Sequence, residues 1–233
     1  MELLSYLGIA LIVLGIDAAI ELALLSSMVG YLHRSGANEY PFRGQTSGSV
    51  ILINAKPKGL GTNEGHLSNG AAGTTLVLIC LVGSGVWFME RRRRMKSNAV
   101  GASKIFWVYT VFTILSFLLT TSALGAFFEV TRQLRGKHID KTIAALHQHQ
   151  AYPLDKWTPG TWTKALLELP LTMDRDRDYL NHWLIIMKGN LYNLIPLFLL
   201  NGVVAVLAVM VALDKTPRHS PVKNVEETVE AKR

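Results

Sequence analysis

The chain has 233 residues, of which 49% are hydrophobic and 18% are charged, and its mean hydropathy is +0.25. A typical soluble domain of this size is excluded, because the sequence is too apolar and its apolar residues are clustered in long runs. The net charge of +7 could suggest nucleic acid, but the densest basic run directly abuts an apolar segment. We therefore attribute the basic residues to membrane topology and expect no nucleic-acid partner.

The first segment, residues 3–32, is almost wholly apolar, yet it carries Asp17 and Glu21 near its middle. Thirty helical residues, at about 1.5 Å each, are long enough to cross a hydrocarbon core of about 30 Å. The two acids are four residues apart and so lie on one helix face. A charge at this depth costs at least about 2.5–3.5 kcal/mol, so the sequence predicts that this face meets protein, water or the other acid. The segment lacks a basic start and a clean cleavage site, which indicates an uncleaved first span.

Three further apolar segments lie at about 71–89, 104–130 and 191–213. Together with the first span they predict an all-α membrane protein, a four-helix transmembrane bundle within residues 1–213. Long polar segments at 34–69 and 131–188 are expected to form two extracytoplasmic loops. The second loop is expected to build a partly helical cap between spans three and four. Residues 214–233 show no period and predict a disordered cytoplasmic tail.

Local patterns in the loops predict short elements. Residues 49–54 indicate a strand, which either pairs with its neighbour near 59–65 or serves as a recognition strand; we favour the pairing. Residues 131–150 predict a helix that continues out of the third span. Thr158 and Pro159 predict the start of a short helix, and a further helix is expected to begin at about Tyr179 and to become the fourth span.

A basic cluster follows the second span and bears on orientation. Positive residues near span ends favour the cytoplasmic side, and four adjacent arginines are hard to translocate. We therefore expect both termini in the cytoplasm and both large loops on the opposite side of an unassigned membrane. Binding of anionic lipid head groups or a sorting signal are the alternative roles. The cluster consists of Arg91, Arg92, Arg93 and Arg94.

The acidic pair allows two interpretations. Buried carboxyl groups at this spacing would share protons readily, which suits proton relay, cation binding or catalysis. Alternatively, hydrogen bonds from the acids lock the packing of the helices, and we favour this structural role. The expected polar partners are Asn193 and Asn201 on the fourth span and Ser116 and Thr120 on the third.

The histidines and the cysteine carry no recognisable metal motif. No H-E-x-x-H pattern is present, and Cys80, the single cysteine, lies inside an apolar run, so no internal disulfide can form. We expect no metal and no cofactor, and we regard a histidine site completed by Asp140 or Asp178 as the weaker alternative. The histidines considered are His138, His147, His149 and His182.

Three segments of the last third of the chain resemble a pattern in uncharacterised four-pass membrane proteins of filamentous fungi. They are Trp-Thr-Pro-Gly-Thr-Trp at 157–162, Leu-Glu-Leu-Pro-Leu at 167–171 and Tyr-Asn-Leu-Ile-Pro-Leu at 192–197. The resemblance implies a four-pass membrane topology and no activity. The layout is also similar to that of tetraspanins and claudins, although the loop cysteines of those families are absent.

The sequence therefore predicts a non-enzymatic organiser or accessory subunit of a membrane complex. Its expected surroundings are the lipid bilayer and either a membrane-protein partner or a second copy of the chain. The alternative is an intramembrane enzyme or proton-coupled carrier that uses Asp17 and Glu21. That alternative requires a polar cavity that reaches the acidic pair from one side of the membrane.

Overall fold

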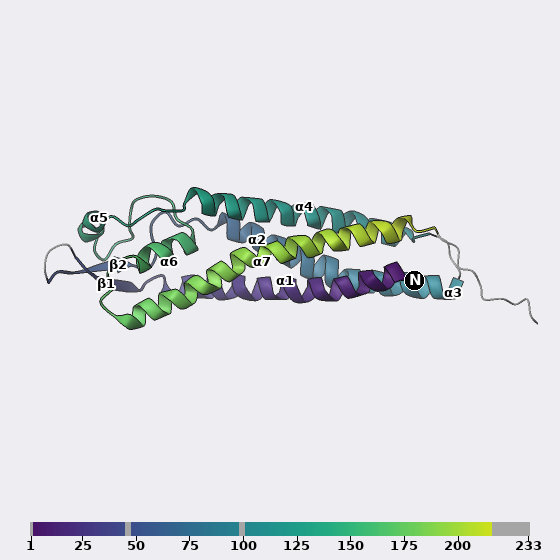
Figure 1. Ribbon diagram of the computed structural model, residues 1–233, viewed down its shortest axis with the longest axis horizontal. Coiled ribbons are helices and arrows are strands. Elements are labelled where there is room, and N and C mark those ends of the chain that lie inside the picture. Colours follow the sequence, from purple (N-terminus) through teal and green to yellow (C-terminus); the bar gives the residue numbers. More distant parts are fainter. Residues whose placement is uncertain (1, 45–47, 98–100, 216–233) are drawn as a thin grey trace, which may run out of the picture.

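The computed structural model describes residues 2–44, 48–97 and 101–215, which form an elongated helical bundle with a small cap at one end (Figure 1). Four helices in this described part are long and apolar enough to cross a membrane, which confirms the predicted all-α four-helix bundle. They are α1 (Glu2–Ser35), α4 (Lys104–Gln133), α7 (Asp174–Leu213) and one continuous helix made of α2 (Asn63–Thr74), η1 (Thr75–Val82) and α3 (Gly83–Ser97).

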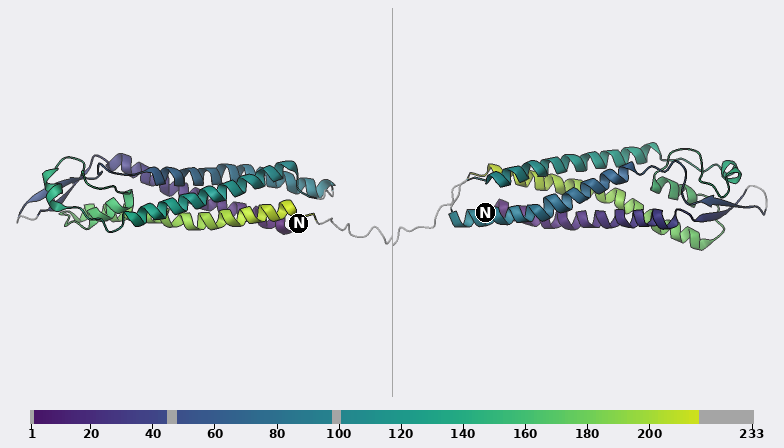
Figure 2. Two further views of the ribbon diagram at one scale, coloured as in Figure 1. Left: turned by 90° about the horizontal axis from the view of Figure 1, so that it is seen from above. Right: turned by 180° about the vertical axis from the view of Figure 1, so that it is seen from behind.

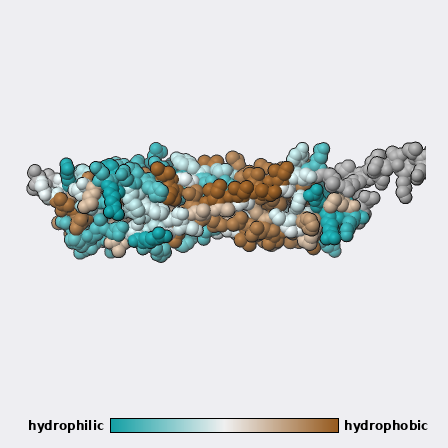
Figure 3. Space-filling view, turned by 90° about the horizontal axis from the view of Figure 1, so that it is seen from below, coloured by the Kyte–Doolittle hydropathy of each residue, from teal (hydrophilic) through white to brown (hydrophobic). Residues whose placement is uncertain are grey.

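The four long helices change partners along the bundle. At the cap end, α7 lies beside α1 and α2 lies beside α4; at the other end, α7 reaches α4 and α3 reaches α1 (Figures 1 and 2). Leu7, Leu11 and Leu14 of α1 are buried against this interior, whereas Ile9 and Ile12 are exposed. Apolar side chains thus cover both the inside and the outside of the middle of the bundle, as a membrane span requires. Figure 3 shows the resulting apolar band between two hydrophilic ends.

The second long helix begins earlier than the predicted span at 71–89 and continues past it to Ser97. Its middle, η1, is a π-helix, in which the backbone hydrogen bonds join residues five apart. The hydroxyl of Tyr109 donates to the carbonyl oxygen of Ile79 at 3.2 Å. The ring of Tyr109 fits against Gly83, where an added Cβ would come within 2.6 Å of the ring. The glycine therefore permits the close contact between this helix and α4.

The helix expected from about Tyr179 does continue into the fourth span, as predicted, but it begins earlier, at Asp174. This helix, α7, runs without a break from Asp174 to Leu213 and continues through Pro196. The charged residues of its first turn lie in the cap, and its apolar half lies in the bundle. This helix therefore connects the two parts of the molecule rigidly. Of the predicted tail at 214–233, only residues 214 and 215 are among the described residues.

The predicted strand at 49–54 forms, but its partner is different. β2 (Val50–Asn54) pairs antiparallel with β1 (Glu39–Arg43), so pairing with a neighbour is confirmed, but the suggested neighbour near residues 59–65 is wrong. The register places Tyr40 opposite Ile53 and Phe42 opposite Ile51, and all four side chains are buried. β1 alternates buried apolar residues in step with β2, which favours this pairing. Leu60, in the segment that was expected to pair, forms a bridge with Trp157 instead.

The predicted helix at 131–150 is wrong as well. α4 ends at Gln133, Gly136 adopts a left-handed φ of 84°, and a separate helix α5 (Lys141–Leu146) follows. The break occurs because glycine tolerates that φ and because Asp140 caps the new helix, accepting from the backbone N–H of Thr142 at 2.7 Å.

The short helix expected at Pro159 is present as α6 (Pro159–Leu167), with Thr158 as its N-cap. Trp157 and Trp162 flank this start and are buried, and Trp162 donates its indole N–H to the carbonyl oxygen of Ala55 at 2.7 Å. Burial raises the pKa of Tyr152 in the same core, so its hydroxyl stays protonated. The cap thus has its own aromatic core above the bundle.

Candidate functional site

Glu21 joins three helices from a fully buried position. Its Oε1 accepts from Ser68 Oγ at 3.0 Å and from Asn190 Nδ2 at 2.7 Å. Its Oε2 accepts from Asn193 Nδ2 at 3.1 Å. Both carboxyl oxygens therefore have donors, from α2 and from α7, and the group holds the cap-side halves of these helices against α1.

Asp17 has a different environment, although it lies one turn away on the same helix. Its side chain is half-buried, its Oδ2 atom is itself buried, and within the described part of the chain this oxygen has no hydrogen-bond partner. A shallow hollow of about 210 Å³ lies beside it, lined otherwise by Val13, Ile16, Ile20 and Leu200. The two acids therefore share a helix face without forming one bonded cluster.

Of the predicted partners, the structure brings only Asn193 to the acidic pair. Asn201 instead donates to Thr75 Oγ1 at 3.2 Å and accepts from Ser116 Oγ at 3.1 Å, and Thr120 donates to the backbone of its own helix. The expectation that Asn201, Ser116 and Thr120 contact the acids is wrong. Asn201 follows Asn193 by eight residues, which is about 12 Å along a helix and beyond hydrogen-bond reach.

Two residues that bind Glu21 were not expected. Asn190 lies three residues before Asn193, and this spacing places both amides on one helix face. The spacing was therefore an available signal, but the predicted span started only at residue 191. Ser68 was assigned to a loop because the predicted second span began at 71, whereas α2 begins at Asn63.

The arginine cluster is partly committed to internal ion pairs. The buried Glu90 accepts from Arg93 at 2.8 Å and from Arg94 at 3.0 Å. Arg94 also pairs with Asp214 at 3.2 Å, which attaches the end of α3 to the end of α7. Arg91 lies over the ring of Trp87, 5.3 Å from its centroid. Half of the cluster thus closes this end of the bundle, and Glu90 is the residue that sequence analysis missed.

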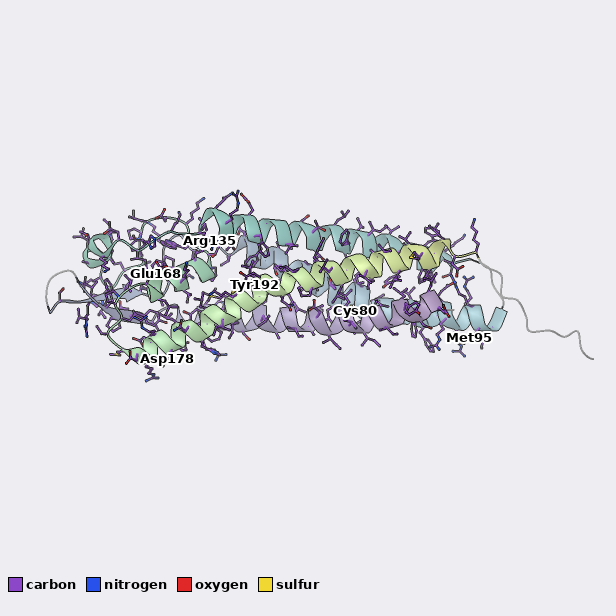
Figure 4. All side chains as sticks on the ribbon, in the orientation of Figure 1. Cys80, Met95, Arg135, Glu168, Asp178 and Tyr192 are labelled. Carbon is purple, nitrogen blue, oxygen red and sulfur yellow. The ribbon has the colours of Figure 1, made fainter. Side chains whose placement is uncertain are left out.

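A cavity of about 1400 Å³ lies at the cap end, where the helix pair α1 and α7 separates from the pair α2 and α4. The cap segments before α5 and around α6 cover it. Figure 4 shows three of its lining residues, Arg135, Glu168 and Tyr192, which come from the loop after α4, the end of α6 and the middle of α7. Neither Asp17 nor Glu21 is among the described residues that line it.

The histidines are dispersed over the cap rather than gathered. His138 pairs with Glu168 at 2.7 Å, and His149 pairs with Glu39 at 3.0 Å. His147 contacts the carbonyl oxygen of Ile143 in its own short helix. Within the residues that the structure describes, no three His, Cys, Asp or Glu side chains form a group that could hold a metal ion.

No family model, no curated protein and no solved structure matches this chain. The resemblance to fungal four-pass membrane proteins therefore stays a prediction, and function has to be argued from the geometry of the bundle.

Proposed function

We propose that this protein is a non-enzymatic accessory subunit of a membrane complex, and that the face of α1 around Asp17 binds a transmembrane helix of a partner protein. One observation carries the proposal. Asp17 lies at the midpoint of the apolar run at 3–32; its side chain is partly exposed beside the hollow, and its buried Oδ2 has no donor among the described residues. A carboxyl group at this depth is costly against lipid, and a partner helix that supplies a donor would relieve the cost.

The surroundings of Asp17 support a helix as the occupant. Val13, Ile16 and Ile20 are 45%, 59% and 47% exposed, and they flank the carboxyl group along α1. Their spacing gives an apolar stripe of two turns, which matches the contact that one helix makes with another. The small hollow beside Asp17 has room for a single side chain from that helix.

The alternative of an intramembrane enzyme or carrier has less support. Both oxygens of Glu21 are occupied by donors, and the cavity at the cap end is lined by neither acid. For orientation we keep the proposal that both termini are cytoplasmic, because the arginine cluster and the N-terminus lie at the same end of the bundle.

Photo-crosslinking in the native membrane tests the proposed partner. A crosslinker placed at Ile16 or Ile20 should form one discrete adduct with another protein, whereas the same group at Leu115, an exposed position on α4, should not. Asp17→Leu should abolish the adduct, and Asp17→Asn, which keeps a hydrogen-bonding side chain, should retain much of it. An adduct of two copies of this chain, or one unaffected by Asp17→Leu, would contradict the proposal.

A further inference from the structure

The lining of the large cavity changes character along the bundle axis. Towards the membrane it is apolar, with Leu25 and Val29 from α1, Phe127 and Phe128 from α4 and Leu191 from α7. These side chains lie at the cap-side ends of the apolar runs. Glu129 on α4 and Lys188 on α7 are the nearest charged residues beyond them. The cavity therefore extends across the level at which the bilayer meets water.

Towards the cap, the lining is strongly basic. Six lysines and arginines line the cavity against two carboxylates, Glu129 and Glu168. Both carboxylates are already paired, Glu129 with Arg132 at 2.9 Å and Glu168 with His138 at 2.7 Å. The six basic residues are Lys56, Arg132, Arg135, Lys137, Lys164 and Lys188.

Three of these cations have no ion-pair partner within the described ranges: Lys56, Arg135 and Lys188. They come from three separate segments, after β2, after α4 and within α7, and the fold brings them to the border of one cavity. By contrast, Lys137 pairs with Asp155 at 2.8 Å and Lys164 lies 3.8 Å from Glu168. The unpaired charges favour an anion at this border.

We propose that the cavity binds one anionic phospholipid, with its head group at Lys56, Arg135 and Lys188 and an acyl chain along the apolar lining between α4 and α7. Basic pockets between transmembrane helices on the cytoplasmic or matrix side of membranes bind anionic head groups, and the same attraction acts on an anionic lipid at the cap end of this bundle. The cavity volume of about 1400 Å³ exceeds the range of about 300–1,000 Å³ that serves small ligands, so a molecule with chains fits better.

An opening towards the bilayer supports a lipid rather than a soluble anion. Gly125 is exposed, and an added Cβ there would meet no atom within 4 Å. Phe128 and Tyr192 contact each other across α4 and α7, with ring centroids 6.3 Å apart, and Tyr192 is 57% exposed. An acyl chain can therefore pass beside Gly125 and rest on these two rings.

Lipid titration tests this proposal independently of the Asp17 face. The full chain is reconstituted in phosphatidylcholine vesicles with increasing phosphatidylglycerol, then extracted, and the co-purified lipid is measured by native mass spectrometry. The wild-type chain should retain one phosphatidylglycerol. The triple variant Lys56→Gln, Arg135→Gln, Lys188→Gln should bind it roughly a hundredfold more weakly, since each cation contributes to head-group attraction. Arg92→Gln, at the opposite end, is the matched control and should retain it fully.

Two further measurements separate the head group from the chain. Gly125→Leu should fill the apolar part of the cavity and reduce lipid retention at least tenfold while the helix keeps its fold, because open space surrounds that position. Glycerol 3-phosphate, which carries the head-group charge without chains, should not displace the lipid at millimolar concentration. Equal binding of both compounds with no effect of Gly125→Leu would overturn the proposal in favour of a soluble-anion site. Absence of retained phosphatidylglycerol in the wild-type chain would overturn it outright.

Discussion

The two ends of the bundle both carry basic residues but use them differently. At the α3 end, Arg93 and Arg94 bind the buried Glu90, and Arg94 also binds Asp214. At the cap end, Arg135 and Lys188 border a large cavity without ion-pair partners among the described residues. The comparison teaches that a count of positive charges does not identify a binding site. A binding site is indicated by the basic residues that have no carboxylate partner within the described part of the protein.

The two ends also differ in how closely their helices pack: the α3 end is tight and the cap end is open. At the α3 end, Trp87 donates its indole N–H to the carbonyl oxygen of Leu4 at 2.6 Å, and its ring lies against Gly8. At the cap end, Gly125 faces open space. Small residues therefore bring helices together at one end and leave room for a ligand at the other.

The largest expected effect is at the closed end. Glu90→Leu should destabilise the protein by about 3–5 kcal/mol, because it leaves Arg93 and Arg94 without their buried partner. The free energy of unfolding in a fixed detergent measures the effect. Glu129→Leu is the matched control: it removes an exposed pair with Arg132 and should leave the free energy of unfolding nearly unchanged, because solvent screens that pair. Equal losses in the two variants would show that the ends do not differ as argued.

The acidic pair gives the next comparison, between two positions one turn apart. Glu21→Leu removes the acceptor of Ser68, Asn190 and Asn193 and should cost about 2 kcal/mol in total, at roughly 0.6 kcal/mol for each hydrogen bond between helices inside a membrane. Asp17→Leu breaks no hydrogen bond of its side chain and should leave the stability of the isolated chain unchanged. The same unfolding measurement applies to both variants. A large loss for Asp17→Leu would mean that the carboxyl group has a structural partner within the chain.

Two glycines sharpen the contrast in packing. Gly83→Ala should cost about 1–3 kcal/mol, because the new methyl group would overlap the ring of Tyr109. Gly125→Ala should instead stabilise the helix by up to about 1 kcal/mol, because nothing lies within 4 Å of the added carbon. Thermal unfolding of the two variants in the same detergent gives the comparison. Similar shifts in both would indicate that the two ends are packed equally tightly.

The four spans could be predicted from sequence because apolar length alone identifies a membrane helix. The start of the second long helix could not, because Ser68 is polar and lies before the apolar run, and its hydrogen bond to Glu21 is a contact between segments far apart in the sequence. The difference between Asp17 and Glu21 was equally hidden, since spacing places both on one face but does not reveal which neighbour supplies donors. The cavity depends on how helices cross, and that crossing follows from packing rather than from any local pattern.

The smallest expected effect concerns the cap segment that covers the cavity. Thr158 lines the cavity and starts α6, accepting from the backbone N–H of Thr161 at 3.1 Å. Thr158→Ala should therefore cost about 1 kcal/mol, while Thr158→Ser keeps the bond and should cost little. Hydrogen exchange should show faster exchange in the first turn of α6 for the alanine variant and unchanged exchange in α3. Faster exchange at both ends would contradict the view that the cap folds around its own aromatic core.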